Sequence, residues 1–353
     1  MRIGYLIFAV PPLFLCSCVS SVRAPAGRAG AGQVDAVRPA WIDGNAAGYP
    51  RSGFVTGVGM ADDPVSAGDR ARSEIAKVFS TKITLNTAVT SYEYSAEARG
   101  STSAYSSQNA VQDLRAVSSR ELEGVEIAET WRDGASGRYY ALAVLGRAKA
   151  LSALSGRLRE TDERLREASR LLASSVEKLR KARYALMVLD ILRERDALFA
   201  DMRVLDPASV PAAEEGAYRR EAVKALAGLD VVLNMGAGGS RTVEAAVIKA
   251  LGTLGMEARS AVSASGADIS VECSVEFSAV PDTDASSRWK WSRGRAAIVL
   301  KDVGTGRVFL NSEVSSREAS STDEGARLKA ESALGRKIGA EIRAGVASFL
   351  EKL

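Results

Sequence analysis

The chain has 353 residues, of which 25% are charged and 46% hydrophobic, and its formal charge is only +4. Basic and acidic residues are interspersed, so we expect no nucleic-acid partner. The chain contains no histidine, which excludes histidine-dependent hydrolases, histidine general bases and histidine-ligated metal sites. We therefore expect a non-enzymatic protein without catalytic, metal-binding or cofactor-binding residues.

The first residues predict an exported chain. Met1 and Arg2 precede an apolar run, Ile3 to Leu15, which contains two prolines and ends in small residues and cysteine. Such a run is too short to cross ~30 Å of hydrocarbon as a helix, and the prolines interrupt it further. A positive start, a short apolar middle and a small-residue exit are typical of a secretory signal peptide, which we place at residues 1–17.

The exit of this segment reads Leu15-Cys16-Ser17-Cys18. It resembles the lipobox of bacterial lipoproteins, in which a leucine stands three residues before the modified cysteine and a small residue stands directly before it. Cys18 fits this pattern, whereas Cys16 follows a bulky leucine and fits poorly. The resemblance implies lipid attachment at Cys18, with acyl chains such as palmitate holding the chain to a membrane. The alternative is an ordinary signal peptide with two incidental cysteines.

Once Cys16 is cleaved off and Cys18 is acylated, Cys273 is the last remaining cysteine, so no intramolecular disulfide is expected. Cys273 lies in an alternating stretch, Ile269 to Val275, where it falls on the same face as the apolar residues. A buried inert thiol is favoured over a reactive one.

Composition and periodicity divide the chain into segments that predict an α+β protein: two small α+β sandwich domains, with helices packed on mainly antiparallel sheets, joined by a long helical hairpin. The segments are 1–17, the signal peptide; 18–37, a flexible tether; 38–147, the first α+β domain; 148–205, the helical hairpin; 206–216, a linker; and 217–353, the second α+β domain.

In the first domain the patterns alternate between strand and helix and end in a hairpin with turn chemistry at 133–137. The expected elements are a strand at 53–60, a helix at 65–80, a strand at 82–89, a serine-rich loop at 95–107, a helix at 108–120, and strands at 125–132 and 138–145.

The next sixty residues have helical periodicity. Leucines recur every seven residues at 158, 165, 172 and 179, but the intermediate positions are Thr161, Ala168 and Ser175, which are weak core residues. We therefore favour an antiparallel hairpin that turns near Ser174-Ser175 and whose second helix carries leucines at 186, 189, 192 and 198. An unbroken dimeric coiled coil is the alternative.

The second domain opens with a short helix, and two later helices are expected to cover one face of a twisted sheet. Gly255 is well suited to end the first of these helices in the left-handed conformation. The expected strands are 229–234, 256–260, 268–279, 289–302 and 306–318, and the helices are 241–254 and 323–350. The last helix is amphipathic, with its apolar face formed by Leu328, Leu334, Ile338, Ile342, Val346 and Leu350.

Several motifs have a functional and a structural interpretation. Gly57-Val58-Gly59 and Gly236 to Gly239 each stand between a strand and a helix, but both lack parts of a phosphate-binding loop. We favour a tight strand exit for the first motif and a flexible connection for the second. The clustered carboxylates at 62–63, 121–126 and 214–215 are explained by solvation rather than by catalysis. Trp289 and Trp291 share one strand face, and we favour core residues over an exposed pair that receives a partner.

Four features occur in order in the first domain: Pro39-Ala40-Trp41, the run from Phe54 to Gly59, the alanine-containing helix after Arg70, and Trp131 with the run from Tyr139 to Leu145. Through these features, residues Pro39 to Ala148 resemble the LPP-twenty lipoprotein family, which is related to the N-terminal domain of flagellar assembly protein T. The C-terminal domain has the order strand, helix, strands and terminal helix, with a hairpin at Val303 to Val308 between its late strands. In this it resembles periplasmic assembly-type α/β domains found in flagellar assembly protein T and in lipoproteins that support curli secretion or peptidoglycan synthases.

These resemblances imply a non-enzymatic outer-membrane lipoprotein acting in envelope or surface-structure assembly, with Cys18 as the only functional position carried over. Val19 and Ser20, rather than an aspartate, follow Cys18, which by analogy favours the outer membrane. The leading hypothesis is a periplasm-facing scaffold or assembly factor, with a flagellar role as one option, an unidentified envelope protein as partner and a homo-oligomer left open. The alternatives are a carboxylate-dependent cell-wall glycan hydrolase and a small-amphiphile carrier.

Overall fold

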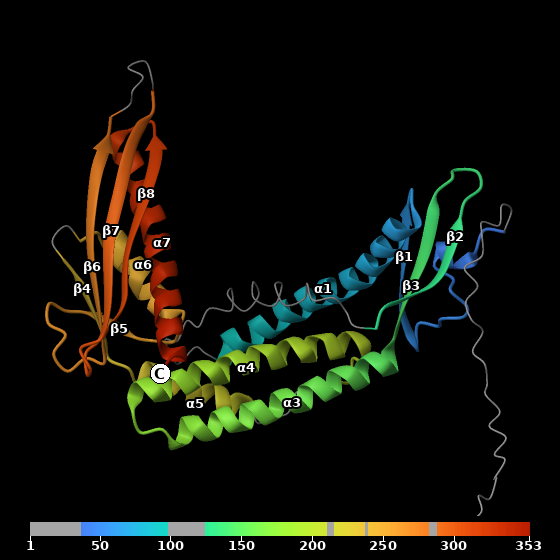
Figure 1. Cartoon of the computed structure of the whole chain (residues 1–353), viewed down its shortest axis with the longest axis horizontal. Helices are drawn as coiled ribbons and strands as arrows, with labels where there is room; N and C mark the ends of the chain where they lie inside the picture. The colour runs from blue at the N-terminus through green and yellow to red at the C-terminus, as the bar shows by residue number, and fades with distance from the viewer. Residues whose placement is uncertain (1–36, 98–123, 210–214, 237–238, 282–287) are drawn as a thin grey trace, which may run out of the picture.

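The computed structural model describes residues 37–97, 124–209, 215–236, 239–281 and 288–353. The predicted signal peptide, Cys18, the tether up to residue 36 and the helix at 108–120 lie outside these residues, as does the serine-rich loop beyond residue 97. The α+β fold is confirmed, with two sheets and a helical hairpin between them (Figure 1). The elements are η1 Ala40–Asp43, β1 Phe54–Ala61, α1 Pro64–Glu97, β2 Glu126–Arg132, β3 Tyr139–Gly146, α3 Arg147–Ser174, α4 Lys178–Leu205, α5 Glu215–Ala227, β4 Val231–Met235, α6 Arg241–Gly252, β5 Ala258–Ser260, β6 Ile269–Val280, β7 Lys290–Asp302, β8 Val308–Ser320 and α7 Asp323–Glu351.

The first sheet is antiparallel, with strand order β1-β3-β2. Its central strand β3 is buried on both faces, and its side chains alternate between two clusters. Ala141, Ala143 and Leu145 pack with α1, whereas Leu142 and Val144 pack with Trp41 of η1. Helix α1 and the segment around η1 therefore close the two faces of this sheet.

The strand predicted at 82–89 is wrong, because these residues belong to α1, which continues to Glu97. The alternation of Ile83, Leu85 and Val89 with threonines is too short to distinguish a strand from part of a helix. No glycine or proline stands between Gly68 and the helix end, so nothing in the sequence stops the helix there.

Gly57 and Gly59 lie inside β1 rather than at a strand exit, which corrects the favoured interpretation. At both positions the side on which a Cβ atom would stand faces α1. A Cβ atom at Gly57 would lie 2.5 Å from the carbonyl oxygen of Ala71, and one at Gly59 would lie closer still to that of Ala67. The two glycines are thus required for the close approach of the helix to the strand.

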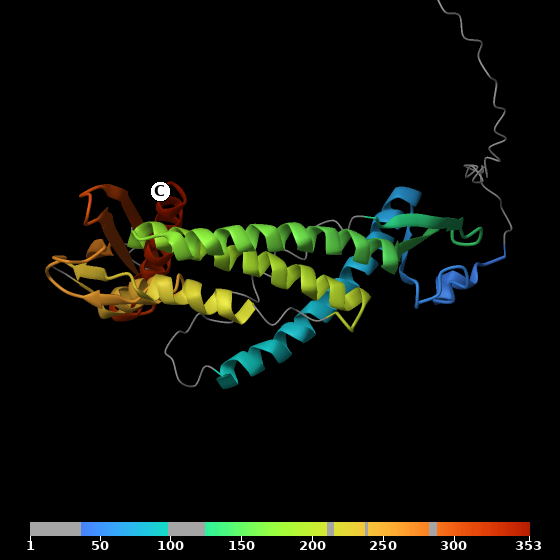
Figure 2. The same ribbon diagram turned by 90° about the horizontal axis from the view of Figure 1, so that it is seen from below.

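The helical hairpin is confirmed, since α3 ends at Ser174 and α4 begins at Lys178 and packs back against it (Figure 2). The unbroken coiled coil is wrong for the same reason. Thr161 and Ala168, which the sequence marks as weak core positions, are nevertheless buried. Small residues at these positions allow the two helices to approach closely, with larger leucines buried alongside at 165, 172, 189 and 192.

Each end of the hairpin enters the core of a different sheet. Near the turn, Leu172 and Leu179 belong to the cluster that fills the second sheet. At the opposite end, Val204 and Leu205 belong to the cluster between the first sheet and α1. There the Arg147 guanidinium donates to the carbonyl oxygens of Val204 and Leu205 at 3.1 and 2.7 Å. Because α3 has 28 residues, the hairpin spans about 42 Å at 1.5 Å per residue.

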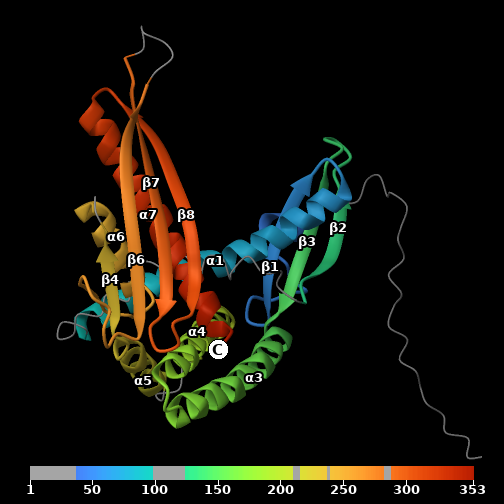
Figure 3. The same ribbon diagram turned by 60° about the vertical axis from the view of Figure 1, so that its left-hand side comes forward.

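The second sheet is mixed, with strand order β5-β4-β6-β7-β8. Strands β6, β7 and β8 form a long antiparallel meander, but β4 pairs in parallel with β5 and with β6. The parallel pairs arise because α6 lies between β4 and β5 in the chain and makes a crossover connection. Helices α6 and α7 both lie on one face of this sheet (Figures 1 and 3).

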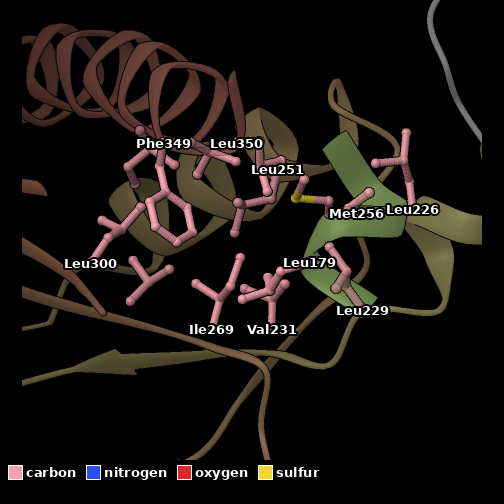
Figure 4. Packing of buried hydrophobic residues seen from close by; sticks show 14 of the residues in the cluster. Leu179, Leu226, Leu229, Val231, Leu251, Met256, Ile269, Leu300, Phe349 and Leu350 are labelled. Atoms are coloured by element: carbon pink, nitrogen blue, oxygen red, sulfur yellow. The ribbon is translucent and has the colours of Figure 1, made fainter. Parts of the chain in front are cut away.

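Figure 4 shows part of the core between these helices and the sheet, where Val231, Ile269 and Leu300 meet Leu251 and Phe349. Five of the six apolar residues predicted for the face of α7 are buried here, but Leu328 is 56% exposed and that assignment is wrong. Its position lies in the second turn of α7, near the end of the sheet.

Cys273 is buried on the inner face of β6, as predicted. Burial raises the pKa of its thiol to about 11, because the thiolate is poorly solvated there. The thiol therefore stays protonated at neutral pH and unreactive towards electrophiles.

None of the helices in the described ranges is both long enough and apolar enough to span a membrane.

Candidate functional site

Cys18, the one site residue predicted from the sequence, lies outside the described residues, so lipid attachment there stays a prediction. Within the described ranges no cluster of three or more cysteine, aspartate and glutamate side chains is arranged to hold a metal ion. The remaining candidates are charged and aromatic side chains on the surfaces of the two sheets and the hairpin.

The predicted carboxylate clusters separate into different structural roles. Asp62 is exposed near Arg138, and Asp63 accepts a hydrogen bond from the backbone nitrogen of Ser66 at 2.9 Å, at the start of α1. The side-chain hydroxyl of Ser66 lowers the pKa of Asp63. Both are local, solvated interactions. Of the residues at 121–126, Glu126 is exposed beside Lys149, and 121–123 lie outside the described ranges.

Glu215 is an exception, because it is not a solvated linker residue as predicted. It pairs with the guanidinium of Arg195, which is only 5% exposed and which also donates to Asp162 at 2.5 Å. The Arg195 guanidinium lies over the ring of Phe199 at 4.8 Å. This cluster joins α3, α4 and α5, and its two carboxylates neutralise one buried cation. Its role is structural: it fixes α5 to the hairpin.

The interpretation of Trp289 and Trp291 as core residues is wrong. Trp289 is 56% exposed, and Trp291 is half-buried on the face of β7 that points away from α6 and α7. Sequence alternation placed both tryptophans on one face of the strand, but it could not tell which face the helices cover. The tryptophans lie at the end of the sheet farthest from the helical hairpin, where β7 begins (Figures 1 and 3).

Arginines surround Trp291 on this outer face. Arg293 and Arg295 follow it at every second position of β7, and Arg317 of β8 is paired directly opposite Arg293. The Arg317 guanidinium lies over the indole of Trp291 at 4.6 Å, a cation–π contact. Among the described residues, no carboxylate forms an ion pair with Arg293, Arg295 or Arg317. We call Trp291 and these three arginines the outer-face cluster.

Two like charges directly opposite on neighbouring strands destabilise a sheet unless something compensates them. Arg293 and Arg317 occupy such a pair. The contact with Trp291 orients the guanidinium of Arg317. The N–H donors of Arg293 and Arg317 therefore lie on the same open face of the sheet. The arrangement suits the binding of an anionic group, for which arginine pairs provide planar, bidentate hydrogen bonding.

The neighbouring sheet edge is closed by lysines of α7. Lys337 donates to the carbonyl oxygen of Ser315 at 2.6 Å, and Lys329 donates to that of Ala319 at 3.1 Å. Both acceptors belong to β8, the edge strand. Covering edge carbonyls with lysine opposes the pairing of another strand. The outer face of this sheet is therefore more accessible to a partner than its edge.

The sequence contains a signal for the outer-face cluster that is neither a catalytic nor a phosphate-binding motif. Trp291, Arg293 and Arg295 alternate at period two within a long predicted strand, which places them on one face. Three bulky polar or amphipathic residues in succession on one face indicate a surface without a covering layer. The contribution of Arg317 could not be predicted, because it depends on the register between β7 and β8.

The described part of the chain is an α+β protein with two sheets separated by a helical hairpin. Residues 39–146 match the family described as LPP20 lipoprotein, which confirms the resemblance predicted for this segment. The matched family is one of lipoproteins. No curated protein matches the chain.

Two solved structures are similar to parts of the chain. The secreted protein HP1454 from the human pathogen Helicobacter pylori is 13% identical, with a TM-score of 0.38, over 81% of this chain and 98% of that one. A minor lipoprotein from Acinetobacter baumannii is 9% identical, with a TM-score of 0.26, over 34% of this chain and 93% of that one.

Proposed function

We propose that the protein is an outer-membrane-anchored, periplasm-facing lipoprotein that acts as a non-enzymatic scaffold for an envelope or surface structure. The lipobox-like sequence at Cys18 and the LPP20 lipoprotein match over residues 39–146 support the anchor. The tether expected at residues 18–37 would hold the first domain a short distance from the lipid surface.

The observation that carries the scaffold role is the attachment of the helical hairpin to both cores. Hydrophobic residues at its two ends belong to separate clusters, one for each sheet. Lys178 adds a 2.9 Å ion pair to Asp268, next to β6, at the turn end. A spacer fixed at both ends keeps two surfaces at a set separation, which a flexible linker would not do. A rigid spacer is useful to a protein that positions other components, so we favour this role.

The anchor is tested by metabolic labelling with a clickable fatty acid. Wild-type protein and the Cys16→Ala variant should both be labelled, because Cys16 is removed with the signal peptide. The Cys18→Ala variant should lose the label and leave the membrane fraction. Equal labelling of Cys18→Ala and wild type would contradict the proposed attachment site.

The scaffold role is tested by crosslinking in intact envelopes followed by affinity purification of the full chain. We expect a defined envelope protein, or an oligomer of the chain, to be recovered repeatedly with wild type and much less with Cys18→Ala. Repeated recovery of neither partner nor oligomer would count against a scaffold.

A further inference from the structure

We propose that the outer-face cluster binds an extended, acidic segment of a partner protein, laid along β7 on the outer face with a carboxylate between Arg293 and Arg317. This inference rests on the proposed scaffold function and deepens it by naming the chemistry of the partner. The cluster comprises Trp291, Arg293, Arg295 and Arg317, and Trp289 stands exposed beside it.

Charge complementarity supports an anionic ligand. On this part of the outer face, Glu276 is the carboxylate nearest in register, directly opposite Arg295, whereas Arg293 faces Arg317 across the strands and Ser278 on its other side. Glu313 is also on this face, opposite Ala297, so the three guanidiniums exceed the two nearby carboxylates. A bound carboxylate would relieve the repulsion between Arg293 and Arg317, and would accept charge-assisted hydrogen bonds from both.

The spacing supports an extended chain. Side chains at every second position of a strand recur about 6.8 Å apart along one face. Trp291, Arg293 and Arg295 follow this spacing, and so do the side chains of any extended peptide laid along them. Such a peptide would place alternate acidic side chains against the arginines and could rest apolar groups on the indole of Trp291. The lysine-covered edge of β8 directs the partner to the face instead of the edge.

An anionic membrane is less suitable as the occupant. Ser320 at the end of β8 pairs with Lys290, so the start of α7 lies at the same end of the sheet as the tryptophans. Asp323 and Glu324 are exposed in this first turn. Arg288 and Lys290 are exposed at the same end, so a continuous anionic surface would meet charges of both signs there, whereas a single chain on the outer face would avoid the two carboxylates.

The test uses the full mature chain in detergent and fluorescence anisotropy of labelled eight-residue peptides. The probes are an alternating Glu-Thr peptide, a peptide of the same composition with its four glutamates consecutive, and an alternating Lys-Thr peptide. The alternating acidic peptide should bind best, and the basic peptide should not bind. Arg293→Gln with Arg317→Gln should weaken binding at least about tenfold, since charge-assisted hydrogen bonds to two donors are lost.

The matched control removes two exposed arginines from α7, Arg336→Gln with Arg343→Gln, which changes the net charge equally. This control should alter affinity by less than about twofold, and both double variants should melt like wild type. Equal weakening by the two double variants, equal binding of the two acidic peptides, or no binding of any peptide would overturn the proposal.

Two further experiments test whether a membrane or a second copy of the chain occupies this face instead. Cys18→Ala chain is sedimented with phosphatidylglycerol vesicles, and the full chain is examined for self-association by analytical ultracentrifugation. Vesicle binding or self-association that depends on Arg293 and Arg317, without binding of the acidic peptide, would assign the face to a membrane or to a second copy and overturn the proposal. Failure of the peptide test would leave envelope crosslinking of the scaffold unaffected, so the two ideas fail separately.

Discussion

The two sheets differ in how many of their faces are covered. In the first sheet, α1 covers one face and the η1 segment covers the other, with Trp41 only 5% exposed and its indole nitrogen donating to Glu129 at 2.7 Å. In the second sheet, α6 and α7 cover one face, and Trp289 is 56% exposed beside the other. The same type of residue closes one sheet and lies on the surface of the other.

This difference separates stability from recognition. A sheet that is packed on both faces has no face left for a partner, so the first sheet is suited to hold the N-terminal unit together. A sheet that is packed on one face is stable through its covered side and offers the other for binding. Substitutions in the two sheets and in the hairpin between them can test this division.

Replacing Trp41 and replacing Trp289 should change stability by very different amounts. Trp41→Ala should destabilise the N-terminal unit by about 3 to 5 kcal/mol, because it empties a buried site and removes the partner of Glu129. Trp289→Ala should change stability by less than about 0.5 kcal/mol, because its side chain is largely in water. Chemical denaturation followed by circular dichroism measures both. Similar losses of stability in the two variants would contradict the proposed difference between the sheets.

The buried cation of the hairpin should be the next most sensitive position. Arg195→Met leaves Asp162 and Glu215 without their shared partner, and should cost about 3 kcal/mol. Arg170→Met removes a solvent-exposed pair with Glu167 on the same hairpin, and should leave stability essentially unchanged because water screens that pair. Hydrogen exchange should show faster exchange in α5 for Arg195→Met alone. Unchanged exchange in α5 would show that this cluster does not fix the helix to the hairpin.

The close contact between α1 and β1 is tested by adding one methyl group. Gly57→Ala should cost roughly 2 to 3 kcal/mol, since its Cβ would meet the carbonyl oxygen of Ala71 and force the helix away. Gly134→Ala, in the turn between β2 and β3, meets nothing within 4 Å and serves as the control. Thermal unfolding compares them, and equal melting temperatures would show that the helix adjusts freely.

Asp201, in α4 of the hairpin, should have a smaller effect on stability, and this effect should depend on pH. Burial raises the pKa of its carboxyl to about 6, with Arg157 opposing the shift. The native state therefore holds this proton more tightly than the unfolded state, and stability should fall as pH rises from about 4 to about 6. Asp201→Asn should add about 1 kcal/mol at pH 7.5 and nothing at pH 4. Stability curves measured at both pH values decide this, and a gain that does not vary with pH would contradict the assignment.

Elements with clear boundaries were predictable from the sequence. The hairpin turn near Ser174, the strands of the long meander and the start of α6 all follow local signals, and Ser240 caps α6 by accepting from the Val243 backbone nitrogen. Gly255 adopts the expected left-handed conformation, with φ of 78°. These features depend on neighbouring residues, so the sequence carries them directly.

Features that depend on distant contacts were not predictable. Glu215 lies in a linker-like stretch, and only the packing of α5 on α4 brings it to Arg195. Trp291 and Arg293 share a strand face whose exposure depends on where α6 and α7 pack. The pairing of Arg293 with Arg317 requires the register of two strands. The alternation of Trp291, Arg293 and Arg295 was thus visible as a sequence pattern, whereas the exposure of their face and the contribution of Arg317 arise from tertiary structure.

If the open face of the second sheet receives a partner while the rest of the protein holds it in place, a partner should be captured from that face alone. A photo-crosslinking amino acid is placed at Trp289, and in a matched variant at Arg336 on α7, in intact envelopes. We expect a discrete adduct from position 289 that is absent from position 336 and lost when Arg293 and Arg317 are replaced by glutamine. Identical adducts from both positions, or none from position 289, would contradict a partner-binding role for this face.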